Sequence, residues 1–159
     1  MSRVQLALRV ADLEGSIAFY SKLFGTEPAK RRPGYANFAI AEPPIKLVLI
    51  EGSAGDDTRL DHLGVEVAST EQVAAATDRL NEAGLATFEE NDTSCCYALQ
   101  DKVWVHGPGK EPWEVYAVKA DADRLGKSAV NGGDACCGAG EQVTDAESAT
   151  ATAGCACGT

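Results

Sequence analysis

The sequence predicts an α+β domain made of two paired βαβββ units, with a flexible tail at the C-terminus. The first observation is an internal repeat: Gln5–Asp12 and His62–Ser69 both alternate apolar residues along a strand that leads through a polar turn into an amphipathic helix. The second is the distribution of bulky apolar residues, which are frequent in 1–120 and rare in 121–159. The domain is therefore expected over 1–120.

The first unit, about residues 1–52, is expected to start with a strand over Gln5–Val10. Asp12 is a suitable helix N-cap, apolar residues then recur at helical spacing, and Gly25 ends the helix. Proline and basic residues in 28–34 predict a weak edge strand and a turn. The two further strands of the unit are predicted over Tyr35–Ala41 and Ile45–Glu51.

The second unit, about residues 60–119, follows a linker and repeats the same order. Ser69 and Gln72 fit a capping box at the start of its helix, and Gly84 is suited to end that helix. Its strands are predicted over His62–Ala68, Ala86–Glu90, Tyr97–His106 and Trp113–Lys119, and the linker over Gly52–Arg59.

The chain is acidic, with a net charge of −10 over 159 residues at pH 7. A surface of that sign repels phosphate backbones and anionic lipid, which excludes nucleic acid and membranes as partners. No apolar stretch approaches the roughly 20 residues that span a bilayer, and charged residues interrupt the N-terminus before any signal-peptide core. We therefore expect a cytoplasmic protein whose six cysteines are thiols rather than disulfides.

Three side chains at related points of the two units predict a metal site. Gln5 and His62 start corresponding strands, and Glu114 lies in the last strand of the second unit, aligned with Leu47 in the first. An acid inside an apolar, aromatic strand needs a cation or a partner. One amide, one imidazole and one carboxylate form a weakly donating set that leaves coordination positions open for water, substrate or O2. The alternatives are a solvated Gln5, a hydrogen-bonded but non-ligating His62, and a Glu114 paired with Lys102 or Lys46.

The adjacent Cys95 and Cys96 predict a second, soft binding point. Thiolates do not naturally share one ion with oxygen and nitrogen donors. Two thiolates match a monosubstituted As(III) species, which has one bond to carbon and two left for sulfur, although other soft ions such as cadmium also fit. Neighbours in a strand point to opposite faces, so joint binding needs a turn, for which Asp92–Ser94 is suited. The alternative is a pair of reduced loop thiols without a function.

The segments Val10–Gly25, Asp61–Val67 and Gly109–Glu114 resemble the glyoxalase/bleomycin-resistance/extradiol-dioxygenase superfamily, also called vicinal oxygen chelate proteins. The resemblance covers about residues 1–119. It implies the paired βαβββ fold of that superfamily, with a metal at these strand positions. The segment Glu89–Val105 contains both cysteines. In combination with this fold, it resembles the corresponding part of the bacterial carbon–arsenic lyases.

That resemblance implies a non-heme, Fe(II)-dependent enzyme of organoarsenical detoxification. Such an enzyme uses O2 to demethylate methylarsenite and to cleave trivalent aromatic arsenicals, releasing arsenite. The resemblance gives Gln5, His62 and Glu114 the metal-ligand roles, and Cys95 and Cys96 the arsenic-binding role. Gln5 stands where extradiol dioxygenases usually have a histidine, and its weaker donation also suits nickel, manganese or cobalt.

Two other classes of function stay open at this stage. One is a non-catalytic protein that sequesters cadmium or an arsenical, and the other is a different glyoxalase-type enzyme or thiol transferase with incidental cysteines. Phe38 and Tyr97 are candidates for lining a pocket, and His106 is expected at a strand end. A homodimer is left open. The tail is expected to be passive, with arsenic capture or exchange as the alternative for its cysteines, which are Cys136, Cys137, Cys155 and Cys157.

Overall fold

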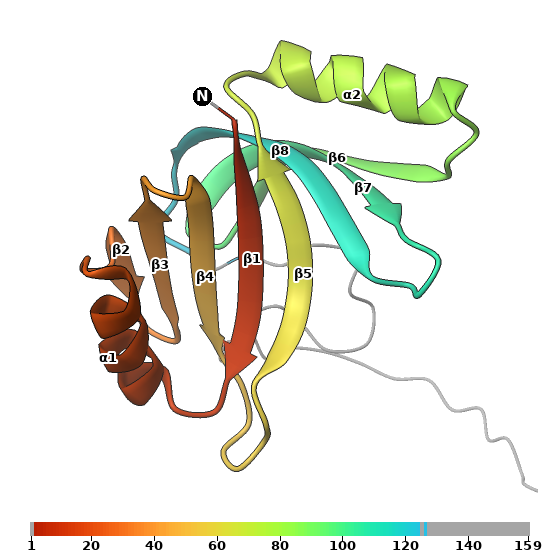
Figure 1. Cartoon of the computed structure of the whole chain (residues 1–159). Helices are drawn as coiled ribbons and strands as arrows, with labels where there is room; N and C mark the ends of the chain where they lie inside the picture. Colours follow the sequence, from red (N-terminus) through yellow and green to blue (C-terminus); the bar gives the residue numbers. More distant parts are fainter. Residues whose placement is uncertain (1, 125, 127–159) are drawn as a thin grey trace, which may run out of the picture.

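The chain forms two successive units of the same order (Figure 1), in a computed structural model that describes residues 2–124 and 126. The first unit consists of β1 (Arg3–Val10), α1 (Leu13–Phe24), β2 (Lys30–Arg32), β3 (Tyr35–Ile40) and β4 (Ile45–Glu51). The second unit consists of β5 (Arg59–Glu66), α2 (Thr70–Glu82), β6 (Thr87–Cys95), β7 (Ala98–His106) and β8 (Pro112–Asp121). This order confirms the predicted pair of βαβββ units.

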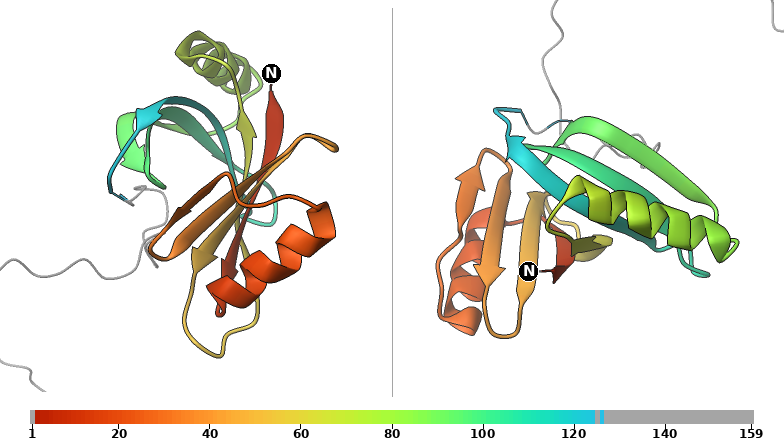
Figure 2. Two further views of the ribbon diagram at one scale, coloured as in Figure 1. Left: turned by 90° about the vertical axis from the view of Figure 1, so that its left-hand side faces the viewer. Right: turned by 90° about the horizontal axis from the view of Figure 1, so that it is seen from above.

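All the strands belong to one eight-stranded sheet, in the order β2-β3-β4-β1-β5-β8-β7-β6. The sheet is strongly curled, and the helices lie on its outer side (Figures 1 and 2). At its centre β1 and β5 pair antiparallel, with Gln5 opposite Gly64 and Ala7 opposite His62. Gln5 of the first unit corresponds to His62 of the second, and Ala7 corresponds to Gly64, so the two pairs are equivalent by the repeat. Gln5 and His62 are therefore equivalent in the structure, as the sequence repeat predicts.

The two helices begin differently from each other. In α1 the Asp12 carboxylate accepts a hydrogen bond of 2.8 Å from the Gly15 amide, which confirms the predicted N-cap. In α2 the Ser69 side chain makes no capping bond, whereas the Gln72 side chain accepts from the Ala68 amide at 2.8 Å. Of the two bonds in the predicted capping box, only the one to the Gln72 side chain forms. Its donor is the backbone amide of Ala68 instead of that of Ser69.

The unbroken apolar run of β4 reflects burial on both faces of the sheet. Leu47 packs on the outer side with Ile17 of α1, together with Phe38. Val48 packs on the inner side with Tyr97. Phe38 therefore belongs to the outer core, and the expectation that it lines a pocket was wrong, whereas Tyr97 does lie on the inner side. In the second unit the helix core consists of Val73, Leu80, Val103 and Ala117.

The strand register corrects one predicted alignment between the units. Gln5 lies opposite Lys46 in the parallel pair of β1 and β4. In the equivalent parallel pair of β5 and β8, Gly64 lies opposite Glu114. Two residues earlier on each strand, His62 is therefore at the level of Pro112. The counterpart of Glu114 is therefore Val48 rather than Leu47. Val48 faces the inner side, as the polar site does, whereas Leu47 faces α1.

Two strands extend beyond their predicted C-terminal ends. β6 continues to Cys95 instead of ending near Glu90, and β8 continues to Asp121, which pairs with Ala98. The predicted tail thus starts within a strand, and its four cysteines lie outside the described residues. Neither α1 nor α2, in the part of the chain that the structure describes, is long and apolar enough to cross a membrane.

Candidate metal and thiol site

Gln5, His62 and Glu114 converge on the inner side of the sheet from β1, β5 and β8. Nε2 of Gln5 lies 3.0 Å from Nε2 of His62 and 2.7 Å from Oε1 of Glu114. The histidine nitrogen lies 3.4 Å from the same carboxylate oxygen. The three residues are 4%, 3% and 2% exposed, respectively. The structure thus brings together the three side chains that the sequence analysis singled out.

The triangle formed by these three polar atoms has the size of one face of an octahedral metal site. Donors about 2.1 Å from an ion and at right angles to each other lie about 3 Å apart, and the edges here are 2.7, 3.0 and 3.4 Å. Gly64 keeps two of the side chains close, since a Cβ there would come 3.1 Å from Cγ of Glu114 and 3.4 Å from Cβ of Gln5. With the amide oxygen of Gln5 in the place of its nitrogen, the residues present would therefore fit a divalent ion.

Gln5 is indispensable to any such site. Across residues 2–124 and 126, no group of three or more His, Cys, Asp and Glu side chains is placed to hold a metal ion. His62 and Glu114 consequently need the amide as the third donor. Only the amide oxygen can serve, because the amide nitrogen is a hydrogen-bond donor without a free lone pair.

Asp61 orients His62. Its Oδ1 lies 2.6 Å from Nδ1 of the imidazole, and its Oδ2 lies 2.7 Å from Nε of Arg9. A carboxylate at Nδ1 keeps the imidazole proton on that nitrogen and leaves the lone pair on Nε2, which faces Gln5 and Glu114. This is the tautomer that a metal ligand requires.

Lys102 pairs with the other oxygen of Glu114. Its Nζ lies 2.7 Å from Oε2, and the lysine is 2% exposed. Burial alone would raise the pKa of the Glu114 carboxyl, but the charge and hydrogen bond of Lys102 outweigh it and hold that pKa well below its usual range. The predicted alternative, a pair between Glu114 and Lys102, is thus present. It leaves Oε1 facing Gln5 and His62, so the pair and the triangle coexist.

A second polar cluster lies behind the Gln5 amide, formed by Tyr116, Glu66 and Lys46. The Tyr116 hydroxyl lies 2.6 Å from Oε1 of Gln5 and 2.8 Å from Oε2 of Glu66. Nζ of Lys46 donates to both the hydroxyl and the same glutamate oxygen, at 2.9 Å in each case. This cluster was not predicted from the sequence. One sequence signal for it exists: side chains alternate between the two faces of a strand, so Tyr116, two residues after Glu114, lies on the same face of β8 as Glu114.

Cys95 and Cys96 lie at the hairpin that joins β6 to β7. Cys95 pairs with Ala98, and the two residues between them, Cys96 and Tyr97, have positive φ angles of 54° and 59°. Such angles at both positions are typical of a tight type I′ hairpin turn. The turn brings the two sulfur atoms to 3.3 Å from each other. The expected turn over Asp92–Ser94 is instead an irregularity within β6, so the sulfur atoms meet because of the hairpin itself.

Contacts from the first unit hold this hairpin. The Tyr97 hydroxyl donates to the Pro33 carbonyl at 3.1 Å, and Nζ of Lys30 donates to the Tyr97 carbonyl at 3.2 Å. The Tyr97 ring lies 5.7 Å from the Tyr35 ring, centroid to centroid. The curled sheet therefore closes on itself at this end, where β6 and β7 meet the edge of the first unit.

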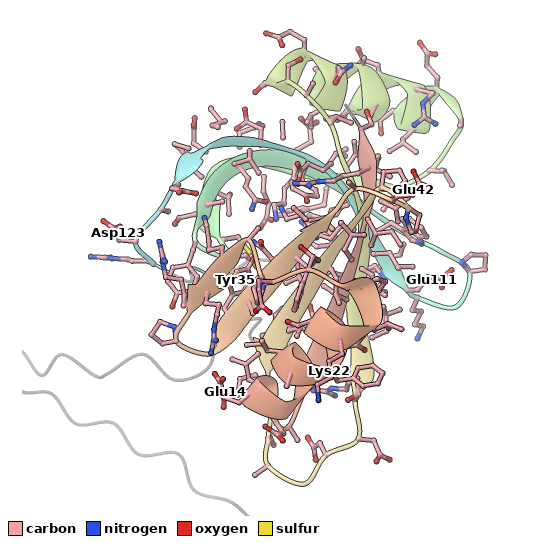
Figure 3. The ribbon with its side chains drawn as sticks, turned by 60° about the vertical axis from the view of Figure 1, so that its left-hand side comes forward. Glu14, Lys22, Tyr35, Glu42, Glu111 and Asp123 are labelled. Atoms are coloured by element: carbon pink, nitrogen blue, oxygen red, sulfur yellow. The ribbon has the colours of Figure 1, made fainter. Side chains whose placement is uncertain are left out.

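The sulfur pair and the polar triangle belong to one interior. The hydrogen bond from Cys96 lowers the pKa of the Cys95 thiol, against the effect of burial, and the Lys102 ammonium lowers it further. The same thiol also interacts electrostatically with Glu114 and His62. Tyr35, which is labelled in Figure 3, belongs to the buried inner cluster against which Cys96 packs, and burial and the charge of Cys96 raise its pKa.

Two other features lie away from this interior. A cleft of about 400 Å³ lies between α2 and the outer face of β5 and β8 and is largely apolar. His106 is exposed at the end of β7, as expected for a strand-end residue, and is opposite Pro112. The cleft is lined by Val65, Val67, Val115, Gln72, Ala75, Ala76 and Arg79.

Comparison with known proteins identifies close relatives. The chain is 68% identical, over 99% of its length and 99% of the relative, to a trivalent organoarsenical cleaving enzyme of Thermomonospora curvata. It is 64% identical to the cadmium-induced protein CadI of Mycobacterium tuberculosis, over 79% of this chain and 82% of that protein.

Structural comparison gives the same fold. An extradiol ring-cleaving dioxygenase from B. fuscum aligns with a TM-score of 0.54 and 23% identity, over 77% of this chain and 34% of the larger protein. The family model described as the Glyoxalase/Bleomycin resistance protein/Dioxygenase superfamily matches residues 3–115. With this match and the two relatives, the chain belongs to the glyoxalase/bleomycin resistance protein/dioxygenase superfamily.

Proposed function

We propose that this protein is an Fe(II)-dependent, O2-using enzyme that cleaves the carbon–arsenic bond of trivalent organoarsenicals, including methylarsenite, and releases arsenite. The observation that carries the proposal is the shared interior, in which a set of oxygen and nitrogen donors lies near enough to a pair of thiols to interact electrostatically with Cys95. A relative at 68% identity that bears the name of an organoarsenical cleaving enzyme supports the substrate class. Fe(II) bound by Gln5, His62 and Glu114 supplies O2 activation.

The cysteines bind the arsenic. A trivalent species R–As(OH)2 exchanges its two hydroxyl groups for the sulfurs of Cys95 and Cys96 and releases two molecules of water. The lowered pKa of the Cys95 thiol favours this exchange, because the thiolate is the nucleophile. One bond of the arsenic remains to carbon, and cleavage of that bond requires it to point into the interior that contains Glu114 and His62.

The other residues set the environment of the reaction. Lys102 keeps a positive charge beside Glu114 and Cys95 and stabilises negative charge that develops between them. The buried inner surface of Tyr35, Val48 and Tyr97 excludes water and holds substrate and oxidant close together. For methylarsenite the reaction balances as CH3As(OH)2 + O2 → CH2O + As(OH)3. Carbon supplies the four electrons that reduce O2, so no external reductant is needed.

The experiment that tests this proposal adds methylarsenite to anaerobically Fe(II)-loaded protein and then admits O2. We expect many equivalents of arsenite per protein, with one formaldehyde per arsenite. Turnover should be lost in the Cys95→Ser/Cys96→Ser protein and retained in the Cys136→Ser/Cys137→Ser protein, which changes another adjacent pair. Stoichiometric retention of the arsenical without arsenite release would replace the proposal with sequestration. Turnover that is indifferent to Cys95 and Cys96 would assign the chain to a different reaction of the superfamily.

A further inference from the structure

The orientation of the Gln5 amide decides whether Gln5 can bind a metal. In the structure its nitrogen faces inward and donates to Glu114 at 2.7 Å, with His62 at 3.0 Å, while its oxygen faces Tyr116. The inward nitrogen gives both other members of the triangle a hydrogen-bond donor. It also places the wrong atom toward a metal ion. Gln5 can serve as a ligand only after its amide turns by half a rotation, which exchanges the positions of oxygen and nitrogen.

The Tyr116 hydroxyl can bond to the amide in either orientation. A hydroxyl both donates and accepts, so it can donate to an amide oxygen or accept from an amide nitrogen. In the first orientation its single proton lies between two acceptors, Oε1 of Gln5 at 2.6 Å and Oε2 of Glu66 at 2.8 Å, and can satisfy only one. In the second, the hydroxyl accepts from Gln5 and donates to Glu66, which satisfies both contacts.

Lys46 and Arg3 keep Glu66 ready to accept that proton. Nζ of Lys46 lies 2.9 Å from Oε2 of Glu66, and Nη2 of Arg3 lies 2.9 Å from Oε1. Lys46 also donates to the Tyr116 oxygen, which leaves the hydroxyl proton free to point at the glutamate. The two cations therefore favour the arrangement in which the amide nitrogen faces Tyr116 and the amide oxygen faces His62 and Glu114.

We propose that Tyr116, backed by Glu66 and Lys46, is the positioning residue that turns the Gln5 amide oxygen toward a bound metal. The inference rests on the metal set of the proposed function, and it deepens that proposal by saying how a glutamine replaces a stronger ligand. Tyr116 acts through Gln5 and has no assigned contact with metal or substrate. Without its hydroxyl, the inward oxygen would leave the buried amide nitrogen without this acceptor, at a cost to metal binding.

Metal affinity is the primary test, measured with Co(II) under anaerobic conditions by competition with a chelator. We expect Tyr116→Phe to weaken Co(II) binding by roughly ten- to a hundredfold, which is the usual effect of removing a residue that orients a metal ligand. The control is Tyr20→Phe. Tyr20 lies on α1 and packs against the outer core of the first unit, on the other side of the sheet from the metal and thiol residues. This control should bind Co(II) as the wild type does.

A double-variant comparison separates orientation from a general structural effect. Glu at position 5 has two equivalent oxygens and needs no orienting partner. Tyr116→Phe should therefore weaken Co(II) binding much less in a Gln5→Glu background than in the wild type. An equal loss in both backgrounds, or no loss in either, would overturn the proposal. If Tyr116→Phe does not fold, Glu66→Gln serves in its place, with a smaller loss expected in the same comparison.

The wild-type protein gives a direct readout by NMR. In the Zn(II)-loaded protein, the side-chain amide protons of Gln5 should show nuclear Overhauser effects to the Tyr116 ring, and in the metal-free protein to the His62 ring. Unchanged contacts on metal binding would refute the rotation. A failure of the proposed metal set looks different: His62→Ala would then bind Co(II) as tightly as the wild type, whatever the amide does.

Discussion

Nζ of Lys102 lies 2.7 Å from Oε2 of Glu114, and each of the two residues is only 2% exposed. A buried pair of this kind gains little over an apolar pair, but removing one partner leaves an uncompensated charge in the interior. Burial lowers the pKa of Lys102, but the charges of Glu114 and Cys95 outweigh it and raise that pKa above its usual value. The lysine is therefore charged at neutral pH and holds one oxygen of the carboxylate.

Replacing Lys102 with Met should destabilise the metal-free protein strongly. We expect the free energy of unfolding to fall by about 3–5 kcal/mol, because Glu114 is left buried without its cation. Urea denaturation measures the loss, and addition of Co(II) should recover part of it. The control is Lys119→Met, whose ammonium is exposed beside Asp92 and Asp101, so the loss of its charge should cost much less. Equal effects of the two substitutions would contradict the assigned role of Lys102.

The Cys95 thiol should ionise at a lower pH than an ordinary cysteine. Its pKa is lowered by the hydrogen bond from Cys96 and by Lys102, so the thiolate fraction at a given pH is larger than that of a free thiol. Thiolate absorbance near 240 nm can be followed against pH in a protein whose four tail cysteines are changed to serine. Its first ionisation should have a midpoint below that of an unperturbed cysteine thiol measured under the same conditions.

Removal of the Cys96 sulfur should reverse this effect. Cys96→Ala deletes the donor to the Cys95 thiolate, so the midpoint of the remaining ionisation should move to higher pH. Lys102→Met should move it in the same direction. A midpoint that stays in place in both variants would mean that the two sulfurs do not share a proton as their 3.3 Å separation indicates.

The order of the fold follows from patterns that are local in the sequence. Alternating apolar residues fix which face of β1 and β5 is buried, and this is why Gln5 and His62 could be placed together. The relation of β4 to β8 could not be fixed in the same way. From Leu47 to Ile50 the residues of β4 are apolar on both faces, so no alternation marks the register there, and the predicted counterpart of Glu114 in β4 was wrong by one position.

Contacts that depend on strand order were not predictable from the sequence. Tyr116, Glu66 and Lys46 come from β8, β5 and β4, and each is an ordinary polar residue when taken alone. They meet because Lys46 and Glu66 lie on strands that flank β1, while β8 pairs with β5 on its other side. The hairpin at Cys96 was hidden for a different reason. Cys-Tyr lacks the glycine or asparagine that normally marks a turn with positive φ angles.

Tyr97 should hold the strained hairpin in place through its contacts with the first unit. Left-handed φ angles at two residues other than glycine cost roughly 1–3 kcal/mol each, so the turn needs support from its surroundings. Tyr97→Phe keeps the ring against Tyr35 and should lower the free energy of unfolding by about 1 kcal/mol through loss of the bond to Pro33. Tyr97→Ala should cost about 3–5 kcal/mol.

Tyr97→Ala and Tyr97→Phe should also differ in their affinity for a trivalent arsenical. Tyr97→Ala should bind phenylarsenite more weakly, because a released hairpin lets the two sulfur atoms move apart, whereas Tyr97→Phe should bind it nearly as the wild type does. The control is Phe19→Ala, which also removes an aromatic ring but at a position that is 59% exposed on α1, and it should leave phenylarsenite binding unchanged. If Tyr97→Phe weakens phenylarsenite binding as much as Tyr97→Ala does, the hydroxyl bond to Pro33, and not the ring packing, maintains the turn.

Asp61 should determine metal affinity through the tautomer of His62. Asp61→Asn can present an amide donor to Nδ1, which would place the imidazole proton on Nε2 and remove the lone pair from the triangle. We expect Co(II) affinity to fall by roughly ten- to a hundredfold. The ring nitrogen chemical shifts of His62 should report the changed tautomer in the metal-free protein. Asp57→Asn, at an exposed position of the linker before β5, should alter neither. A Co(II) affinity that falls while the His62 tautomer is unchanged would assign the loss to Arg9, whose Nε lies 2.7 Å from Asp61.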